Sequence, residues 1–171
     1  MDVRRRAPRK VRFTNPQVSQ RGVTWDDVSI RVREIAQQIG SQKIGTILAI
    51  RNGGIIPAYY LAGILKYSAK SNKTAPLLCE IQASYYKDTV RQKHVKIGTL
   101  PKNLIEPILI VDDINDTSET ILKVSELICR RTKITKIKVA TLYEKTWAKV
   151  KADYCGERKV LVWLKFPWET K

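Results

Sequence analysis

The sequence predicts an α/β fold: a single domain with a mostly parallel central sheet flanked by helices. Short apolar runs, which are typical of buried strands, alternate with segments whose apolar residues recur every three or four positions, which is typical of amphipathic helices. This alternation is the pattern of a parallel sheet with helices on both faces. The 171 residues are enough for one domain with a substantial core.

The first helix is expected to begin after Thr24 and to end near Gly40. Thr24 is a suitable N-cap, and Asp27 three residues later completes a pattern like a capping box. The apolar residues of the segment are spaced three or four apart, which gives the helix one face for the core. They are Val28, Val32, Ile35, Ala36 and Ile39.

The apolar run 46–50 predicts a short buried strand, and a helix is expected over 55–67. Residues 75–81 predict a second strand. The polar stretch 82–100 that follows has no clear period, and a stretch of this length is usually a functional loop or a hairpin-like lid. The alternative is an ordinary exposed loop around Ser84, Tyr85 and Tyr86.

Residues 107–111 give the strongest signal for a buried strand. An amphipathic helix with Ile121 and Ile128 on its apolar face follows this strand. Two further strands are predicted at 137–142 and 160–164, so that strand and helix continue to alternate toward the end of the chain.

The net charge of +16, from 32 basic and 16 acidic residues, implies anionic partners. Phosphorylated small molecules and nucleic acids both fit, and so does simple adaptation to a saline or nucleoid-rich environment. Part of the excess lies in residues 1–21, a basic segment expected to be mobile or to lie along a partner surface. Its cluster consists of Arg4, Arg5, Arg6, Arg9, Lys10 and Arg12.

Several classes of protein are disfavoured. No apolar run approaches the roughly 20 residues that a membrane span requires, and the basic N-terminus lacks the apolar region of a secretory signal. The three cysteines, Cys79, Cys129 and Cys155, match no zinc-site spacing, and their odd number argues against a disulfide framework. We therefore expect a cytoplasmic protein without a membrane span.

The segment 108–120 carries the chemistry. Ligands of open α/β sheets bind beyond the carboxyl ends of the strands, which is where Asp112 and Asp113 are expected. Two adjacent carboxylates are costly there unless a ligand uses them. A ribose 2′,3′-diol is a suitable partner, because each hydroxyl can donate a hydrogen bond worth roughly 1.5–3 kcal/mol to a carboxylate.

Residues 116–120 lead into a helix N-terminus, where free backbone N–H groups and the helix dipole favour a dianionic phosphate. The hydroxyls of Thr117, Ser118 and Thr120 are expected to add donors. One turn can therefore hold a ribose diol and a 5′-phosphate. Each residue alone is equally consistent with a helix cap or a loop solubiliser, but the run as a whole favours a phosphoribosyl site.

The run Ile-Leu-Ile-Val-Asp-Asp-Ile-Asn-Asp-Thr-Ser-Glu-Thr at 108–120 resembles the signature with which type I phosphoribosyltransferases bind 5-phosphoribosyl pyrophosphate (PRPP). The resemblance implies that Asp112 and Asp113 bind the ribose hydroxyls, with Asp113 also near Mg²⁺. It implies that Asp116 lies by the purine N7, where it can handle a proton. These three aspartates are the candidate catalytic residues, and the 5′-phosphate loop would consist of Asp116, Thr117, Ser118, Glu119 and Thr120.

Three other segments resemble the xanthine–guanine branch of this family. Residues 23–27 look like its opening Val-Ser-Trp-Asp, residues 50–58 like its pyrophosphate loop, and residues 163–169 like its C-terminal Trp-x-x-x-Pro-Trp-acid hood. The resemblance extends over nearly the whole chain. It implies a phosphoribosyltransferase domain at 22–171, with a small hood formed largely by 143–171.

The resemblance also assigns a purine site. Trp163 would stack on the base, an interaction worth roughly 1–3 kcal/mol, and the backbone at Leu164 would read the 2-position. Lys145 would donate to the purine O6, which favours 6-oxo bases over adenine. Taken singly, Trp163 fits core packing and Lys145 a solvated surface, but the C-terminal pattern as a whole favours the ligand roles.

The pyrophosphate loop departs from the family pattern. The family usually has Arg or Lys directly before the two glycines, whereas Asn52 holds that place here and Arg51 comes one residue earlier. Neighbours in an extended segment point opposite ways, so the displaced basic residue is expected to point away from the pyrophosphate. The loop's backbone N–H groups can also bind it, because Gly53 and Gly54 allow close approach.

The resemblance implies an enzyme of purine salvage that transfers 5-phosphoribosyl from PRPP to guanine, xanthine or hypoxanthine, with Mg²⁺ as cofactor and a dimer or tetramer as the assembly. The alternative is a non-catalytic regulator that senses PRPP or nucleotides and binds nucleic acid through the basic segment. A regulator has no need of Lys145 and Trp163, so these residues favour the enzyme.

Overall fold

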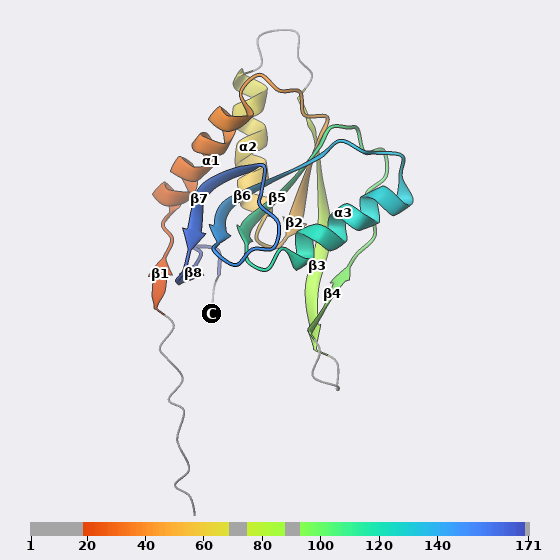
Figure 1. Cartoon of the computed structure of the whole chain (residues 1–171). Helices are drawn as coiled ribbons and strands as arrows, with labels where there is room; N and C mark the ends of the chain where they lie inside the picture. The colour runs from red at the N-terminus through yellow and green to blue at the C-terminus, as the bar shows by residue number, and fades with distance from the viewer. Residues whose placement is uncertain (1–18, 69–74, 88–92, 170–171) are drawn as a thin grey trace, which may run out of the picture.

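The computed structural model describes residues 19–68, 75–87 and 93–169, so the basic cluster at 4–12 lies outside the described residues. Its main sheet contains β2 (Thr46–Arg51), β3 (Leu77–Lys87), β4 (Lys93–Ile97), β5 (Ile108–Asn115), β6 (Ile137–Lys145) and β7 (Tyr154–Val160). The spatial order is β4-β3-β2-β5-β6-β7 (Figure 1), and every pair is parallel except β3 with β4. The predicted α/β fold with a mostly parallel sheet is confirmed.

Helices cover both faces of this sheet. Helices α1 (Trp25–Ile39) and α2 (Ile55–Ser68) lie on one face and α3 (Glu119–Arg131) on the other (Figure 1). Successive residues of a strand alternate between the two cores: Ile47 packs with α1 and α2, whereas Leu48 packs with α3. Strands buried on both faces read as continuous apolar runs, which is why the central strands were predictable.

Helix α1 begins and ends as predicted. Thr24 Oγ1 accepts from the backbone N–H of Asp27 at 3.1 Å, and the backbone N–H of Thr24 donates to Asp27 Oδ2 at 2.9 Å. This reciprocal pair is the capping box that the sequence indicated. The helix ends before Gly40, whose φ of 57° is a conformation that glycine adopts without steric cost. No helix in the described part of the chain combines the length and the apolarity that a membrane crossing requires.

Strand β3 is longer than the 75–81 segment predicted. It continues to Lys87 because β4 pairs with its outer half in an antiparallel hairpin, so that Ser84 pairs with Lys96. Residues 84–86 therefore belong to a strand, and the hairpin alternative describes this region better than an open loop. The tip at 88–92 lies outside the described residues.

The strand predicted at 160–164 is wrong. Strand β7 ends at Val160, and β8 (Trp163–Lys165) belongs to a separate two-stranded sheet with β1 (Gln20–Gly22). Leu161, between β7 and β8, is 67% exposed. The apolar run at 160–164 thus crosses from one sheet to another, and the β1–β8 pair brings residues 20–22 to the C-terminal part of the chain.

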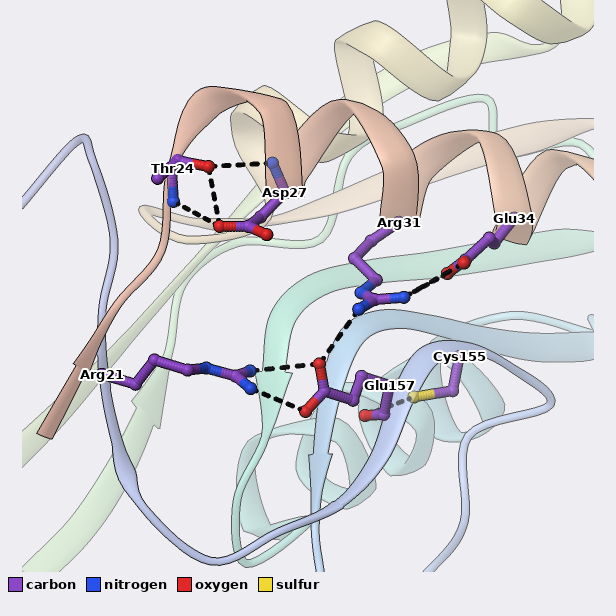
Figure 2. Close-up of polar contacts among 7 residues, drawn as sticks. All are labelled: Arg21, Thr24, Asp27, Arg31, Glu34, Cys155 and Glu157. Atoms are coloured by element: carbon purple, nitrogen blue, oxygen red, sulfur yellow. Dashed lines mark hydrogen bonds and ion pairs between the residues drawn. The ribbon is translucent and has the colours of Figure 1, made fainter. Parts of the chain in front are cut away.

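An ion-pair network attaches this small sheet to the domain (Figure 2). The Arg21 guanidinium donates to both carboxylate oxygens of Glu157 at 2.9 and 3.1 Å, and it lies 5.3 Å from the centre of the Tyr143 ring. Arg31 donates to the same Glu157 at 3.1 Å and to Glu34 at 2.8 Å. One carboxylate on β7 therefore joins β1 and α1.

We expect Glu157→Gln to lower the free energy of unfolding by about 1–2 kcal/mol, because it leaves two neighbouring guanidinium groups without their shared counter-charge. Urea denaturation measures the change. Glu126→Gln is the matched control: it removes an ion pair with Arg130 whose side chains are 54% and 74% exposed, and it should cost at most about 0.5 kcal/mol. Equal losses in the two variants would contradict a special role for Glu157.

Candidate active site

A cavity of about 860 Å³ lies at the carboxyl end of the sheet, between the ends of β2 and β5 and the first turn of α3. This is the edge at which open α/β sheets bind ligands. It brings together nine of the predicted site residues, namely Arg51, Asp112, Asp113, Asp116, Thr117, Ser118, Glu119, Thr120 and Trp163. Its lining does not include Asn52, Gly53, Gly54, Lys145 or Leu164.

Asp112 and Asp113 lie side by side near the end of β5, both partly buried. The backbone N–H of Asp113 donates to Asp112 Oδ1 at 3.0 Å. Burial raises the pKa of Asp112 well above its ordinary value, and repulsion by Asp113 adds to this rise. Burial also raises the pKa of Asp113, to about 6, although hydrogen bonds from the Ile114 backbone and the Trp168 side chain oppose the rise. Strongly perturbed acids in a cavity are typical of a functional site.

The loop after β2 packs directly against these acids. A Cβ on Gly53 would lie 2.2 Å from Asp113 Oδ2, and a Cβ on Gly54 would lie 2.1 Å from the carbonyl oxygen of Val111. Both distances are far below van der Waals contact, so no residue with a side chain fits either position without a shift of its surroundings. The two glycines therefore let the β2 loop approach β5.

Arg51 lines the cavity and Asn52 does not, contrary to the expectation that the displaced basic residue points away. The peptide bond between them is cis. The Arg51 side chain is half-exposed, and its Nε lies 3.4 Å from Glu80 Oε2 on β3. A positive charge therefore lies at the cavity edge next to the glycine loop. It belongs to Arg51, one residue before the position where the family pattern has its basic residue.

The first turn of α3 is arranged like an anion site. Ser118, its N-cap, has left-handed backbone angles (φ 66°, ψ 1°), and its side chain caps no N–H group of the helix. The first intrahelical bond runs from Leu122 N to Ser118 O at 2.9 Å, so the N–H groups before it have no helical acceptor. Thr117 Oγ1 is buried, and no group in the described residues bonds to it. These donors are available to a phosphate.

Two side chains of the same turn are engaged elsewhere. Ser118 Oγ donates to the carbonyl of Val150 at 3.1 Å and accepts from its N–H at 3.0 Å, and a role of this hydroxyl toward the phosphate stays a prediction. The Glu119 carboxylate pairs with Lys123 one helical turn further on, at 3.6 Å. The turn therefore provides mainly backbone N–H groups, rather than side chains, as hydrogen-bond donors for an anion.

On the other side of the cavity, Asp116 Oδ1 accepts from the indole Nε1–H of Trp147 at 2.7 Å. Lys145 is buried, and its ammonium group donates to the carbonyl of Val162 and lies 5.2 Å from the centre of the Trp147 ring. Burial lowers the pKa of Lys145, and attraction by Asp116 opposes this. An acid and a cation therefore stand close together beside the cavity.

Trp163 is 56% exposed and lines the cavity, which rejects the alternative that it is a core residue. The next residue, Leu164, is buried in the core and pairs with Arg21 of β1. A strand alternates its side chains between two faces, so anchoring Leu164 inward turns Trp163 outward. The role of the Leu164 backbone stays a prediction.

Sequence reasoning missed two tryptophans that reach the aspartates. Trp168 lies close enough to Asp113 to oppose the rise of its pKa, and it stacks on Phe166 with ring centres 5.0 Å apart. Trp147 bonds to Asp116. Trp168 belongs to the C-terminal motif 163–169, where its presence was a usable signal, whereas Trp147 lies in a turn with no period or motif.

The fold and the cavity together define a class of protein: an α/β domain whose site suits a sugar phosphate at the carboxyl edge of its sheet. Residues 24–171 match the phosphoribosyl transferase domain family. The chain belongs to that family, as a type I phosphoribosyltransferase domain.

Solved structures agree with this assignment. The chain is similar to a purine phosphoribosyltransferase from Pyrococcus horikoshii Ot3 at 28% identity and a TM-score of 0.72, over 90% of this chain and 95% of that one. It is similar to the xanthine-guanine-hypoxanthine phosphoribosyltransferase of Helicobacter pylori at 25% identity and a TM-score of 0.72, over 88% and 94%. A hypothetical protein from Neisseria gonorrhoeae with bound ppGpp, at 21% identity and a TM-score of 0.75 over 91% and 92%, shares the fold.

Gly53→Ala should displace the Asp113 carboxylate, because the added Cβ would overlap it. We expect a loss of about 1–3 kcal/mol in the free energy of unfolding, the usual cost of overpacking. Gly63→Ala on α2 is the matched control, since a Cβ there meets nothing within 4 Å; it should leave stability unchanged or raise it by up to about 1 kcal/mol. Thermal denaturation of both variants measures the difference. Equal stability of the two variants would contradict tight packing of Gly53 against Asp113.

Asp113→Asn should stabilise the protein at neutral pH. The folded-state pKa, about 6, exceeds the ordinary value of 3.8, so the folded state binds the proton more tightly and the free energy of unfolding falls as the pH rises through this window. We expect the variant to gain about 0.5–2 kcal/mol at pH 7.5, with the gain vanishing near pH 4.

Asp27→Asn is the control of opposite sign for this pH series. Hydrogen bonds from Thr24 lower the pKa of Asp27, so its contribution to stability is present at neutral pH and is lost on acidification. Denaturation curves between about pH 2.5 and pH 8 should show the gain of Asp113→Asn growing as the pH rises above about 4, whereas the deficit of Asp27→Asn stays constant above about pH 4 and shrinks only below it. A parallel response would contradict the assignment of costly burial to Asp113.

Proposed function

We propose that this protein transfers the 5-phosphoribosyl group of PRPP to a 6-oxopurine, namely guanine, xanthine or hypoxanthine, and releases a nucleoside monophosphate and pyrophosphate in purine salvage. One observation carries the proposal. The paired acids Asp112 and Asp113, the N-terminus of α3 and the exposed ring of Trp163 line one cavity. Such a cavity suits a ribose, its phosphate and a flat base together.

The PRPP half of the site uses both charge and backbone groups. The free N–H groups at the start of α3 and the hydroxyl of Thr117 would bind the 5′-phosphate. The ribose hydroxyls would donate to Asp112 and Asp113. The pyrophosphate would lie against the glycine loop, where Arg51 supplies a positive charge.

The family typically uses Mg²⁺ together with PRPP, and the residues present fit this ion. No group of three metal-ligating side chains occurs among the described residues, but Mg²⁺ is usually held by one or two carboxylates together with substrate phosphates and water. Asp112 and Asp113 provide such carboxylates, and burial raises the pKa of both, so a bound cation would relieve the cost of their ionised forms. When bound, the ion would neutralise charge on the pyrophosphate.

The purine half of the site would read a 6-oxo base. Trp163 would stack on its face, and Lys145 would exchange the carbonyl of Val162 for the purine O6, which is also a carbonyl oxygen. Adenine has a 6-amino donor instead, which cannot accept from an ammonium group. Asp116, close to Lys145, would accept the proton of N7. The similarity to purine phosphoribosyltransferases supports this assignment.

In the reaction, the bond between C1 of the ribose and the pyrophosphate breaks, and a nitrogen of the base attacks C1. The positive charge that develops on the ribose ring lies beside Asp112 and Asp113, which stabilise it, while Asp116 accepts the base proton. Catalysis then rests on positioning and electrostatics. Trp163, which lines the cavity from the C-terminal part of the chain, would help to exclude water.

The homo-oligomer and the binding of nucleic acid through residues 1–21 stay predictions. The arginine cluster that motivates the second of them lies outside the described residues.

A spectrophotometric assay with PRPP, Mg²⁺ and each of guanine, xanthine, hypoxanthine and adenine tests the proposal. We expect turnover of at least one 6-oxopurine. The kcat/KM for adenine should be at least about 100-fold lower than that for this base. Lys145→Met should reduce kcat/KM for the 6-oxopurine by about 10- to 100-fold without changing PRPP affinity. A folded protein that turns over no base would reject the transfer reaction, and one that also fails to bind PRPP would reject the site.

A further inference from the structure

Trp147 contacts both of the groups that the proposed function assigns to the polar edge of the purine. Its Nε1–H donates to Asp116 Oδ1 at 2.7 Å, and the ammonium of Lys145 lies over its ring at 5.2 Å from the centre. Asp116 precedes α3 and Lys145 ends β6, so one side chain links two separate elements. The indole is 52% exposed, so it does not fill a core.

The loop that bears Trp147 is fixed against the phosphate-binding turn. The carbonyl of Val150 accepts from Asn115 Nδ2 at 2.7 Å and from Ser118 Oγ at 3.1 Å, and the Val150 N–H donates to Ser118 Oγ at 3.0 Å. Asn115 and Ser118 lie on either side of Asp116 in the sequence. The loop is thus anchored to the same short segment whose acid Trp147 contacts.

A buried carboxylate completes this anchor. Glu144 is 4% exposed, and it accepts from Asn115 Nδ2 at 3.2 Å, from the Ala152 N–H at 2.6 Å and from Arg158 Nη1 at 2.7 Å. A buried charge with several hydrogen bonds holds its partners in one geometry, because releasing any of them leaves an unpaired polar group. Hydrogen bonds at Glu144 and Val150 therefore tie the segment 144–152, which bears Trp147, to residues 115–118.

The chemistry of the contact divides the work of Asp116 between its two oxygens. An indole N–H can only donate, so Trp147 occupies Oδ1 as an acceptor and leaves Oδ2 for the N7–H of the base. The ring face attracts the Lys145 ammonium and keeps it beside Asp116. Both polar groups are then oriented before the base arrives, which reduces the entropy that binding must overcome.

We propose that Trp147 is a positioning residue that sets the orientation of Asp116 and thereby the recognition of purine N7. The inference rests on the proposed function, because it takes a 6-oxopurine as the ligand of Asp116 and Lys145. Trp147 lies outside the sequence motifs, and the inference adds it to the residues that determine the base specificity of the site.

Trp147→Phe separates the two contacts, since it keeps a ring near Lys145 and removes the N–H donor. We expect KM for hypoxanthine to rise about tenfold, the usual effect of one lost hydrogen bond to a charged group, with KM for PRPP and the thermal midpoint unchanged. Trp147→His restores an N–H donor and should recover part of the loss. Tyr59→Phe, at an exposed aromatic residue of α2 outside the cavity lining, is the matched control and should behave as wild type.

A purine analogue distinguishes orientation of Asp116 from general shaping of the pocket. In 7-deazahypoxanthine a carbon replaces N7, so the analogue cannot donate to Asp116. We expect wild type to bind hypoxanthine more tightly than the analogue, and Trp147→Phe to lose most of this preference while binding the analogue as wild type does. This is a double-mutant cycle between the residue and the ligand atom.

Three results would overturn the inference. An equal loss of affinity for both ligands would mean that Trp147 only shapes the pocket. Tighter binding of hypoxanthine by Trp147→Phe would mean that the indole obstructs the site. If wild type is active and Trp147→Phe has the same kinetics, the contact between Trp147 and Asp116 has no role in recognition. If wild type itself turns over no 6-oxopurine, the proposed function fails first and the inference falls with it.

Discussion

Asp112 and Asp113 place two carboxylates side by side at the end of a strand that is buried on both faces, and burial makes their ionised forms costly. Much of the surrounding structure accommodates this pair. The β2 loop approaches it through Gly53 and Gly54, which leave room that no side chain permits. The Trp168 side chain lies near Asp113 and partly opposes the rise of its pKa. The free N–H groups of α3 stand next to it, so that positive and negative ligand groups find opposite partners within one cavity.

The segments that form the site are held by polar networks as well as by the two apolar cores. Glu157 joins β1 and α1 to β7, and so fixes the small sheet that presents Trp163 (Figure 2). Glu144 joins the loop 146–153 to the turn before α3. Hydrogen bonds in such networks are directional, so they define one geometry more sharply than apolar packing does, although Asn115 Oδ1 and Arg31 Nε find no partner among the described residues. The cores set the scaffold, and these carboxylates set the orientation of the groups at its edge.

Residue pattern was enough to predict the central part of the fold. The strands β2 and β5 are buried on both faces over most of their length, so their continuous apolar runs identified them. The capping box of α1 is a local interaction between Thr24 and Asp27, and it needs no tertiary context. The edge of the sheet was harder, because β7 reads Tyr-Cys-Gly-Glu-Arg-Lys-Val and the outer half of β3 is polar. Backbone pairing with a neighbouring strand determines whether such a segment forms a strand. The hydropathy pattern of the segment does not reveal this pairing.

The same division holds for the site. By itself, the sequence determined that Asp112, Asp113 and the turn at 116–120 follow a buried strand and precede a helix, since adjacent residues stay adjacent in any fold. Tertiary structure decided which side chains meet them. It turned the Ser118 hydroxyl toward Val150, put Arg51 rather than Asn52 on the cavity, and brought Trp147 to Asp116 across 31 positions of the chain. Contacts of this kind depend on how β-strands are ordered in space, which is a property of the whole sheet and not of any one segment.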